Sequence, residues 1–240
     1  MNELNTTLIV ETPAVTVRSI AVSEMSNNVY LLTNRATGDQ VLIDAADDFE
    51  AIKTFAAEAR QADRFVDAGP AAKPADEGAA VRAIITTHSH WDHIRALPEA
   101  VEAWDPATYC GAPDAAAIAE QEGVEVEDHL AGGERLTLAG IELEVIALRG
   151  HTPGSITLAL RVPAGADAGG RVLLFTGDSL FPGGVGKTWS PEDFKQLFAD
   201  VSERIFDRFG DDTVVLPGHG DSTTLGNERP QLPEWEARGW

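Results

Sequence analysis

The sequence predicts an α/β protein with a four-layer αββα sandwich, in which two mixed β-sheets pack face to face and helices cover their outer faces. Three observations favour this class. The 240 residues are 43% hydrophobic, which suffices for a sizeable core. Each half of the chain has several strand-like runs followed by a helical run. Each half also ends in short turns that carry histidine or aspartate. We expect one domain over residues 1–240, with the halves meeting near residues 130–149.

The first half combines short strands with helices. A helix is expected over Phe49–Arg60, where apolar residues recur on one face. Residues 61–79 contain glycine and proline without a hydrophobic period, so we expect a surface insertion there. Further helices are expected over Asp92–Ala103, with a kink or a restart at Pro98, and over Ala112–Glu120. The strands expected in this half are Val15–Val22, Asn28–Leu32, Val41–Ile43, Val81–Thr86, Ala107–Cys110 and Val124–Val126.

The second half has more strands, tight turns and one long helix. The helix is expected over Pro191–Phe209, because its apolar residues form a single stripe. Ala139 and Gly140 are typical of a hairpin turn. The strands expected here are Glu134–Leu138, Ile141–Leu148, Ser155–Val162, Val172–Phe175 and Val214–Leu216.

Charge and cysteine content narrow the classes of partner. The chain has 39 acidic and 18 basic residues, and its formal net charge of −21 disfavours nucleic acid and anionic membrane surfaces. No apolar run is long enough to span a bilayer, and the first residues lack the basic region of a signal peptide. The single cysteine, Cys110, is expected to pack at a strand end and not to act as a nucleophile. We therefore expect a soluble cytoplasmic protein.

Three of the six histidines lie within six residues, directly after the strand expected over Val81–Thr86. His88 and His90 are two residues apart in extended backbone, so their side chains can point to the same side. Asp92 and His93 follow where the chain turns, and they can face a second position. Imidazole and carboxylate groups suit zinc and similar divalent metals. This short motif therefore favours two adjacent metal sites.

Three later turns supply further candidate ligands, namely His151, Asp178 and His219. Each lies just before or after a strand and is flanked by glycine, which permits close approach of the backbone. His129 is the histidine left over, and we expect it at the surface. The concentration of histidine and aspartate in such turns predicts a two-metal hydrolytic site.

The motifs and their order resemble the metallo-β-lactamase superfamily from about Asn28 to Gly220. The resemblance is carried by four runs: His88–His93, His151–Ser155, Thr176–Ser179 and Pro217–Gly220. Within that superfamily the chain is most similar to the glyoxalase II (hydroxyacylglutathione hydrolase) group, in its short bacterial form. That closer similarity is carried by Gly177–Phe181, Gly184–Thr188 and Gly218–Arg229.

The resemblance implies the metallo-β-lactamase fold and a ligand set for two divalent metal ions. Zinc is the metal expected first, with iron or manganese as alternatives. The family pattern assigns His88, His90 and His151 to one metal, Asp92, His93 and His219 to the other, and Asp178 to a bridge between them. It implies that a hydroxide shared by the two metals is the nucleophile and that one metal polarises the carbonyl under attack. Asp92 and Asp178 are accordingly the candidate catalytic residues.

The resemblance also implies a small-molecule substrate, a thioester of a small acyl group with a low-molecular-weight thiol. Lys187 matches a basic residue that helps to bind the carboxylate of the thiol carrier, and Trp189 matches an aromatic residue beside it. The chain stops at Trp240, without the helical C-terminal domain with which long glyoxalase II enzymes hold glutathione. The identity of the carrier therefore stays open, and no oligomeric state is predicted.

Two alternatives of the same fold are also open. One is a persulfide dioxygenase-like oxidoreductase with a single iron, held by residues that match His88, His151 and Asp178. The other is a hydrolase of a different ester or of a lactone. The complete second ligand set favours two metals, and it therefore favours hydrolysis over the oxidoreductase.

Overall fold

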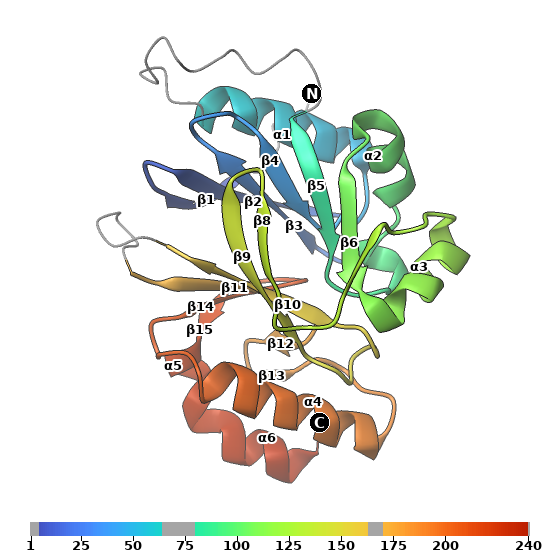
Figure 1. Cartoon of the computed structure of the whole chain (residues 1–240). Coiled ribbons are helices and arrows are strands. Elements are labelled where there is room, and N and C mark those ends of the chain that lie inside the picture. The colour runs from blue at the N-terminus through green and yellow to red at the C-terminus, as the bar shows by residue number, and fades with distance from the viewer. Residues whose placement is uncertain (1–4, 64–79, 163–169, 240) are drawn as a thin grey trace.

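A computed structural model describes residues 5–63, 80–162 and 170–239, and these residues form the four layers predicted (Figure 1). Two sheets lie face to face at the centre, and helices cover the outer face of each sheet. The helices over the first sheet are α1 (Phe49–Asp63), α2 (Leu97–Trp104) and α3 (Ala115–Glu122). Those over the second sheet are α4 (Pro191–Val201) and α6 (Leu232–Arg238), and the short α5 (Leu225–Glu228) lies between β15 and α6 in the chain. The predicted fold class is confirmed.

The first sheet contains seven strands in sequence order. They are β1 (Thr7–Glu11), β2 (Val15–Val22), β3 (Asn27–Asn34), β4 (Gln40–Ile43), β5 (Val81–Thr86), β6 (Ala107–Gly111) and β7 (Asp128–Leu130). The first four strands pair antiparallel as a meander, and the strands from β4 to β7 pair parallel. The sheet is therefore mixed, with its parallel part next to the helices that connect those strands.

The second sheet has the strand order β15-β14-β11-β10-β9-β8. Its strands are β8 (Arg135–Leu138), β9 (Ile141–Ala147), β10 (Ile156–Arg161), β11 (Val172–Gly177), β14 (Val214–Pro217) and β15 (Thr223–Thr224). Only β11 and β14 pair parallel. The predicted hairpin at Ala139 and Gly140 is confirmed: both residues have positive φ, 50° and 74°, as a type I′ turn requires. A small hairpin of β12 (Leu180–Phe181) and β13 (Gly184–Val185) follows Asp178.

The main core lies between the two sheets. Leu32 and Ile85 of the first sheet and Leu158 and Phe175 of the second belong to one buried cluster. Because helices cover the other face of each sheet, the central strands are buried on both faces and have near-continuous apolar sequences. This burial makes the sheets rigid supports for the turns at their edges.

Parallel pairing brings the polar turns to one edge of the sandwich. β4 and β5 are parallel, so Asp44 and Thr87, which follow these strands, lie side by side. β11 and β14 are also parallel, so Asp178 lies beside the turn that carries His219. Backbone hydrogen bonds then join the sheets at this edge, for example from Ile156 N to Thr87 O at 2.9 Å.

The helix predicted over Asp92–Ala103 does restart near Pro98, but the helical part predicted before that point is wrong. The chain forms a 3₁₀ turn, η1 (Trp91–His93), and α2 begins only at Leu97. The N–H of Ala96 donates to the carbonyl of Ala45 at 3.0 Å, in the loop after β4. This tertiary hydrogen bond replaces a helical one, and it leaves the η1 side chains free to face the edge of the sheet.

The strand predicted over Val124–Val126 is also wrong. Both valines are buried, but they pack in the cluster between the first sheet and its helices. The strand that pairs with β6 begins two residues later, at Asp128. The alternating pattern therefore indicated that the valines are buried, but these residues form an extended connection that is not hydrogen-bonded into the sheet.

The helix predicted over Pro191–Phe209 is interrupted. α4 ends at Val201, and a π-helical turn, η3 (Ser202–Phe206), continues it. Ile205 and Phe206 still belong to the buried cluster beneath α4, so the wider turn preserves the predicted apolar stripe. Several short elements were not predicted, among them β1, a largely exposed edge strand, and α6, a short helix that buries Trp235.

The predicted surface insertion at 61–79 is only partly within the described residues. Its first three residues extend α1 to Asp63, whose carboxylate pairs with Arg18 at 2.7 Å, and residues 64–79 lie outside the description. The insertion therefore stays a prediction. Within the described ranges, no helix is both long and apolar enough to cross a membrane.

The close approach of β6 to the turn after β9 gives a test of this packing. A Cβ on Gly111 would overlap the carbonyl oxygen of Gly154, which is backbone and cannot move aside. We expect Gly111→Ala to lower the free energy of unfolding by more than about 3 kcal/mol, measured by urea denaturation. Gly123→Ala is the control, because that position has open space but a φ of 69°, and it should cost only about 1 kcal/mol. Equal losses would contradict the proposed contact.

Candidate metal centre

All seven predicted ligand residues lie together at the edge where the two sheets meet. Two trios of side chains there place their ligand atoms within 4.8 Å of one another: His88, His90 and His151, and Asp92, His93 and His219. A third group of the same kind, formed by His88, His93 and Asp178, connects them. We call the first trio the His trio and the second the Asp–His trio. Their role as metal ligands stays a proposal, but their convergence is a property of the structure.

Asp178 lies between the two trios. Its Oδ1 is 3.4 Å from Nε2 of His93, and its Oδ2 is 3.7 Å from Nε2 of His151 and 3.5 Å from Nε2 of His219. Each oxygen of the carboxylate therefore faces at least one histidine. This is the placement expected of a group that bridges two cations.

Four histidines are oriented by a contact at Nδ1. The contacts are Thr87 Oγ1 with His88, Asp44 Oδ2 with His93, the carbonyl of Lys187 with His151 and the carbonyl of Met25 with His219, at 2.7–3.0 Å. Each contact fixes the ring and leaves Nε2 directed toward the cluster. Supporting groups of this kind are typical of histidines that bind metal.

Buried atoms without partners show that the centre fits a metal. Among the described residues, Nε2 of His88, Nε2 of His151 and Oδ1 of Asp178 are buried and have no hydrogen-bond partner. A Cβ on Gly218 would overlap Asp178 Oδ1, so only glycine permits the turn to lie this close. Buried polar atoms without partners are costly. The nitrogen and oxygen donor set therefore fits divalent metal ions.

The two trios differ in protonation. Burial, reinforced by the neighbouring imidazoles, holds the pKa of His88 well below its ordinary value. Burial also lowers the pKa of His151, against the opposing charge of Asp178. Burial lowers the pKa of His93 too, but the nearby carboxylates of Asp178 and Asp44 outweigh it and raise the pKa to about 10. The His trio is thus ready to bind metal as neutral imidazole, whereas His93 must release a proton first.

The carboxylate of the Asp–His trio stays ionised. Burial alone would raise the pKa of Asp92. The hydrogen bond from His219 and the charge of His93 have a larger, opposite effect, so the pKa lies below its ordinary value. Asp92 Oδ2 lies 3.1 Å from Nε2 of His219. Asn27 Nδ2 donates to the same oxygen at 3.0 Å and to the main-chain carbonyl of Asp92 at 2.9 Å. The amide of Asn27 therefore fixes the orientation of Asp92.

Asp44 and Asn27 were missed as functional residues. Asp44 is 2% exposed, and it accepts hydrogen bonds from Thr87 N at 2.7 Å and Thr87 Oγ1 at 2.8 Å in addition to its contact with His93. Its φ of 60° is unusual for a residue other than glycine. The sequence signal that could have identified Asp44 is its position directly after the buried strand β4. Nothing in the sequence near Asn27 pairs it with a residue 65 positions away.

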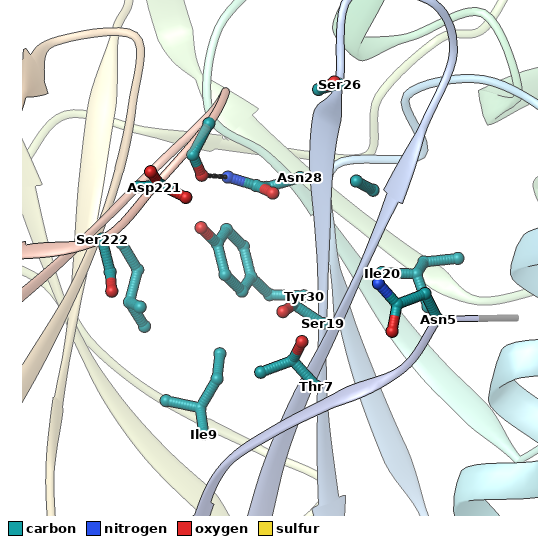
Figure 2. Close-up of a pocket in the computed structure, with 13 residues that line it drawn as sticks. Asn5, Thr7, Ile9, Ser19, Ile20, Ser26, Asn28, Tyr30, Asp221 and Ser222 are labelled. Carbon is teal, nitrogen blue, oxygen red and sulfur yellow. Dashed lines mark hydrogen bonds between the residues drawn. The ribbon is translucent and has the colours of Figure 1, made fainter.

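Side chains of β3 hold the turn that carries His219 by hydrogen bonds to its main-chain carbonyls. Asn28 Nδ2 donates to the carbonyls of Pro217 and Gly220 at 3.0 and 2.9 Å, and the hydroxyl of Tyr30 donates to Pro217 O at 2.7 Å. Figure 2 shows Asn28 and Tyr30 beside this turn, lining a cavity that also includes Asp221 and Ser222. Asn27 and Asn28 are neighbours on β3, so their side chains point to opposite faces of the sheet.

The predicted substrate-binding residues lie at the rim. Lys187 and Trp189 are both exposed, with Lys187 Nζ 4.4 Å from the centre of the Trp189 ring. The Trp189 ring centre is 6.4 Å from that of His90. The carbonyl of Lys187 also orients His151, so this segment borders the His trio.

Two further predictions concern residues away from the cluster. His129 is exposed on β7, as expected. Cys110 is fully buried on β6, and burial, with the charge of Asp114, raises the pKa of its thiol to about 12. A buried thiol with so high a pKa is a poor nucleophile.

Comparisons with known proteins agree with this geometry. A family model described as the metallo-beta-lactamase superfamily matches residues 22–219. The probable metallo-hydrolase YqgX of Bacillus subtilis is 32% identical over 172 residues, which cover 66% of this chain and 77% of that protein. The hydroxyacylglutathione hydrolase GloC of Haemophilus influenzae is 30% identical over 173 residues, 64% of this chain and 75% of that protein.

A solved structure extends the comparison to the fold. TTHA1623, crystallised in a di-iron-bound form, superposes with a TM-score of 0.59 at 28% identity. The superposition covers 88% of this chain and 96% of that chain. The similarity therefore includes most of both molecules.

The contact between Asp44 and His93 gives a test of the centre. Asp44→Asn keeps the size of the side chain but removes the charge that orients His93. We expect zinc affinity at the Asp–His trio to fall about 10- to 100-fold, measured by competition with a chromophoric chelator. Asp63→Asn is the control, because Asp63 is equally buried but pairs with Arg18. That variant should lose stability and keep its zinc affinity. Unchanged affinity in Asp44→Asn would refute the positioning role.

Proposed function

The chain belongs to the metallo-β-lactamase superfamily, and we propose on that basis that it is a binuclear metal-dependent hydrolase of thioesters. The proposed substrate joins an acyl group to a low-molecular-weight thiol. The observation that carries the proposal is the convergence of two trios on Asp178, with buried donor atoms that lack partners. The donor set supports two cations side by side.

Relatives support both parts of the proposal. GloC, at 30% identity, is a hydroxyacylglutathione hydrolase, which favours thioesters over other substrates. TTHA1623, at 28% identity, holds two iron ions, which favours a binuclear centre and keeps iron beside zinc and manganese as the metal.

The chain's residues have distinct roles in the proposal. His88, His90 and His151 would hold one metal, Asp92, His93 and His219 the other, and Asp178 both. When bound, two divalent metals would supply a hydroxide at neutral pH and polarise the thioester carbonyl. Asp44, Thr87 and Asn27 keep the ligands in place. No serine or cysteine nucleophile is needed, and buried Cys110 is unsuited to that role.

The rim supplies a binding site for the thiol carrier. Lys187 is a cation on an otherwise acidic chain, and its ammonium group lies over the indole of Trp189. A carboxylate of the carrier can pair with Lys187 while the acyl carbon reaches the centre beyond His90. This contact lies away from the reacting carbonyl, so it contributes binding that is equal in the ground state and the transition state.

Metal analysis with a thioester panel tests the proposal. Protein purified and then loaded with zinc, iron or manganese should hold about two equivalents and hydrolyse S-acyl thiols, including S-lactoylglutathione. Asp178→Asn should lose metal and activity together. One iron per chain with oxygen consumption on a thiol persulfide would instead favour the dioxygenase-like oxidoreductase. Hydrolysis of lactones or oxygen esters without thioesters would place the chain with the other hydrolases of this fold.

A substitution at Lys187 tests the carrier site. Lys187→Ala should raise KM about five- to tenfold for a thioester whose thiol carries carboxylates, with kcat little changed, because a rim charge is partly screened. A thioester of a neutral thiol should show no such increase. Lys53→Ala, an exposed lysine on the outer helix α1, is the control. An equal rise in KM for both substrates would remove the proposed role of Lys187.

A further inference from the structure

Most of the exposed large apolar residues belong to chain segments that border the metal centre. Among the described residues, four such side chains are exposed: Leu8, Met25, Trp91 and Trp189, at 45–65%. Three of them lie in segments that adjoin the cluster. Trp91 lies between His90 and Asp92 in the chain, Trp189 packs near His90, and the carbonyl of Met25 accepts from His219. Exposed apolar groups at the mouth of a polar site are typical of ligand contacts.

The turn that carries Met25 is part of the centre and is firmly held. Besides the 3.0 Å contact between Met25 O and His219 Nδ1, Gly220 N donates to Ser26 O at 3.4 Å. The next residue, Asn27, donates to Asp92. The position of Met25 relative to the Asp–His trio is therefore set by the same hydrogen bonds that support the trio.

The same turn has an unusual backbone. Ser23 and Ser26 have φ values of 65° and 57°, in the left-handed region that residues other than glycine seldom adopt. The hydroxyl of Ser23 accepts from Met25 N at 3.0 Å and contacts Asn27 Oδ1 at 2.6 Å, which holds the conformation. Such strained residues cluster where function needs a particular geometry. Here the strained turn leaves a half-exposed methionine beside His219.

The two sides of the centre differ in charge. Lys187 and Trp189 border the His trio and offer a cation to the substrate. Met25 borders the Asp–His trio, and the nearest charged residues along its two segments are Glu24 and Asp221, both acidic and exposed. An anionic group is favoured on the Lys187 side and repelled on the Met25 side. The reacting carbonyl lies between the two halves of a thioester, so each half meets a different side.

We propose that Met25 contacts the acyl half of the substrate, and that this protein selects uncharged, apolar acyl groups. The inference rests on the proposed thioester hydrolysis and adds the class of acyl group. A flexible, polarisable methionine suits aliphatic or aromatic groups of varied shape. A short hydroxylated acyl group would leave Met25 exposed to water and would gain little from it.

Two thioesters of glutathione that differ only in the acyl group test this inference. Wild-type protein should prefer S-hexanoylglutathione over S-lactoylglutathione. Met25→Ser should lower kcat/KM about five- to tenfold for the hexanoyl substrate and less than about twofold for the lactoyl substrate, because only the former loses apolar contact. Met25→Leu should restore the preference. Leu8→Ser removes an equally exposed apolar side chain from the edge strand β1 and should change neither rate. Equal losses on both substrates, or none on the hexanoyl substrate, would overturn the role of Met25.

A binding measurement separates this inference from the proposed function. Isothermal titration with S-hexylglutathione and S-(2-hydroxypropyl)glutathione, which cannot be hydrolysed, measures recognition without turnover. If wild-type protein binds the hexyl compound more tightly and Met25→Ser does not, the inference is supported. This holds even if neither thioester is cleaved, because a lack of cleavage would refute only the proposed hydrolysis. Equal affinities in wild-type protein and Met25→Ser would overturn the role of Met25 whatever the hydrolysis shows.

Discussion

The structure depends on holding five imidazoles and two carboxylates against one another at the seam between two sheets. Neither sheet supplies the whole set: His88, His90, Asp92 and His93 follow β5, whereas His151, Asp178 and His219 come from turns of the second sheet. The apolar core between the sheets sets their separation. Parallel strand pairs then bring the turns to one edge, because the carboxyl ends of parallel strands point the same way.

Keeping such groups together has a cost that the surrounding residues offset. Buried donors without partners destabilise a protein until a ligand satisfies them. Asp44 and Asn27 compensate in part, since each fixes one member of the Asp–His trio through a buried hydrogen bond. Metal binding would supply the remainder, which couples the stability of this edge to occupancy of the centre. The strained φ of Asp44 is tolerated for the same reason, because three hydrogen bonds hold it.

The two sides of the centre suggest how an acidic protein would accept the anionic thioester that we propose as its substrate. The net charge of −21 would repel such a molecule at long range. Lys187 supplies a local cation beside the His trio, and Met25 supplies an uncharged surface beside the Asp–His trio. The main-chain carbonyl of each residue also orients a histidine: that of Lys187 contacts His151, and that of Met25 contacts His219. The proposed substrate contacts and the contacts that orient the histidines therefore come from the same short segments.

The sequence by itself determined the fold class and the seven residues of the cluster. Apolar alternation marked β2 and an apolar run marked β5, both at their observed bounds. The His88–His93 motif and three glycine-flanked turns marked the site, because these signals are also local in the chain. Only the tertiary structure decided the roles of Asp44, Asn27 and Met25, the start of α2 and the unpaired state of Val124–Val126. Those features depend on partners far away in sequence. Periodicity shows that a residue is buried, but it cannot show which hydrogen-bond partner burial brings to it.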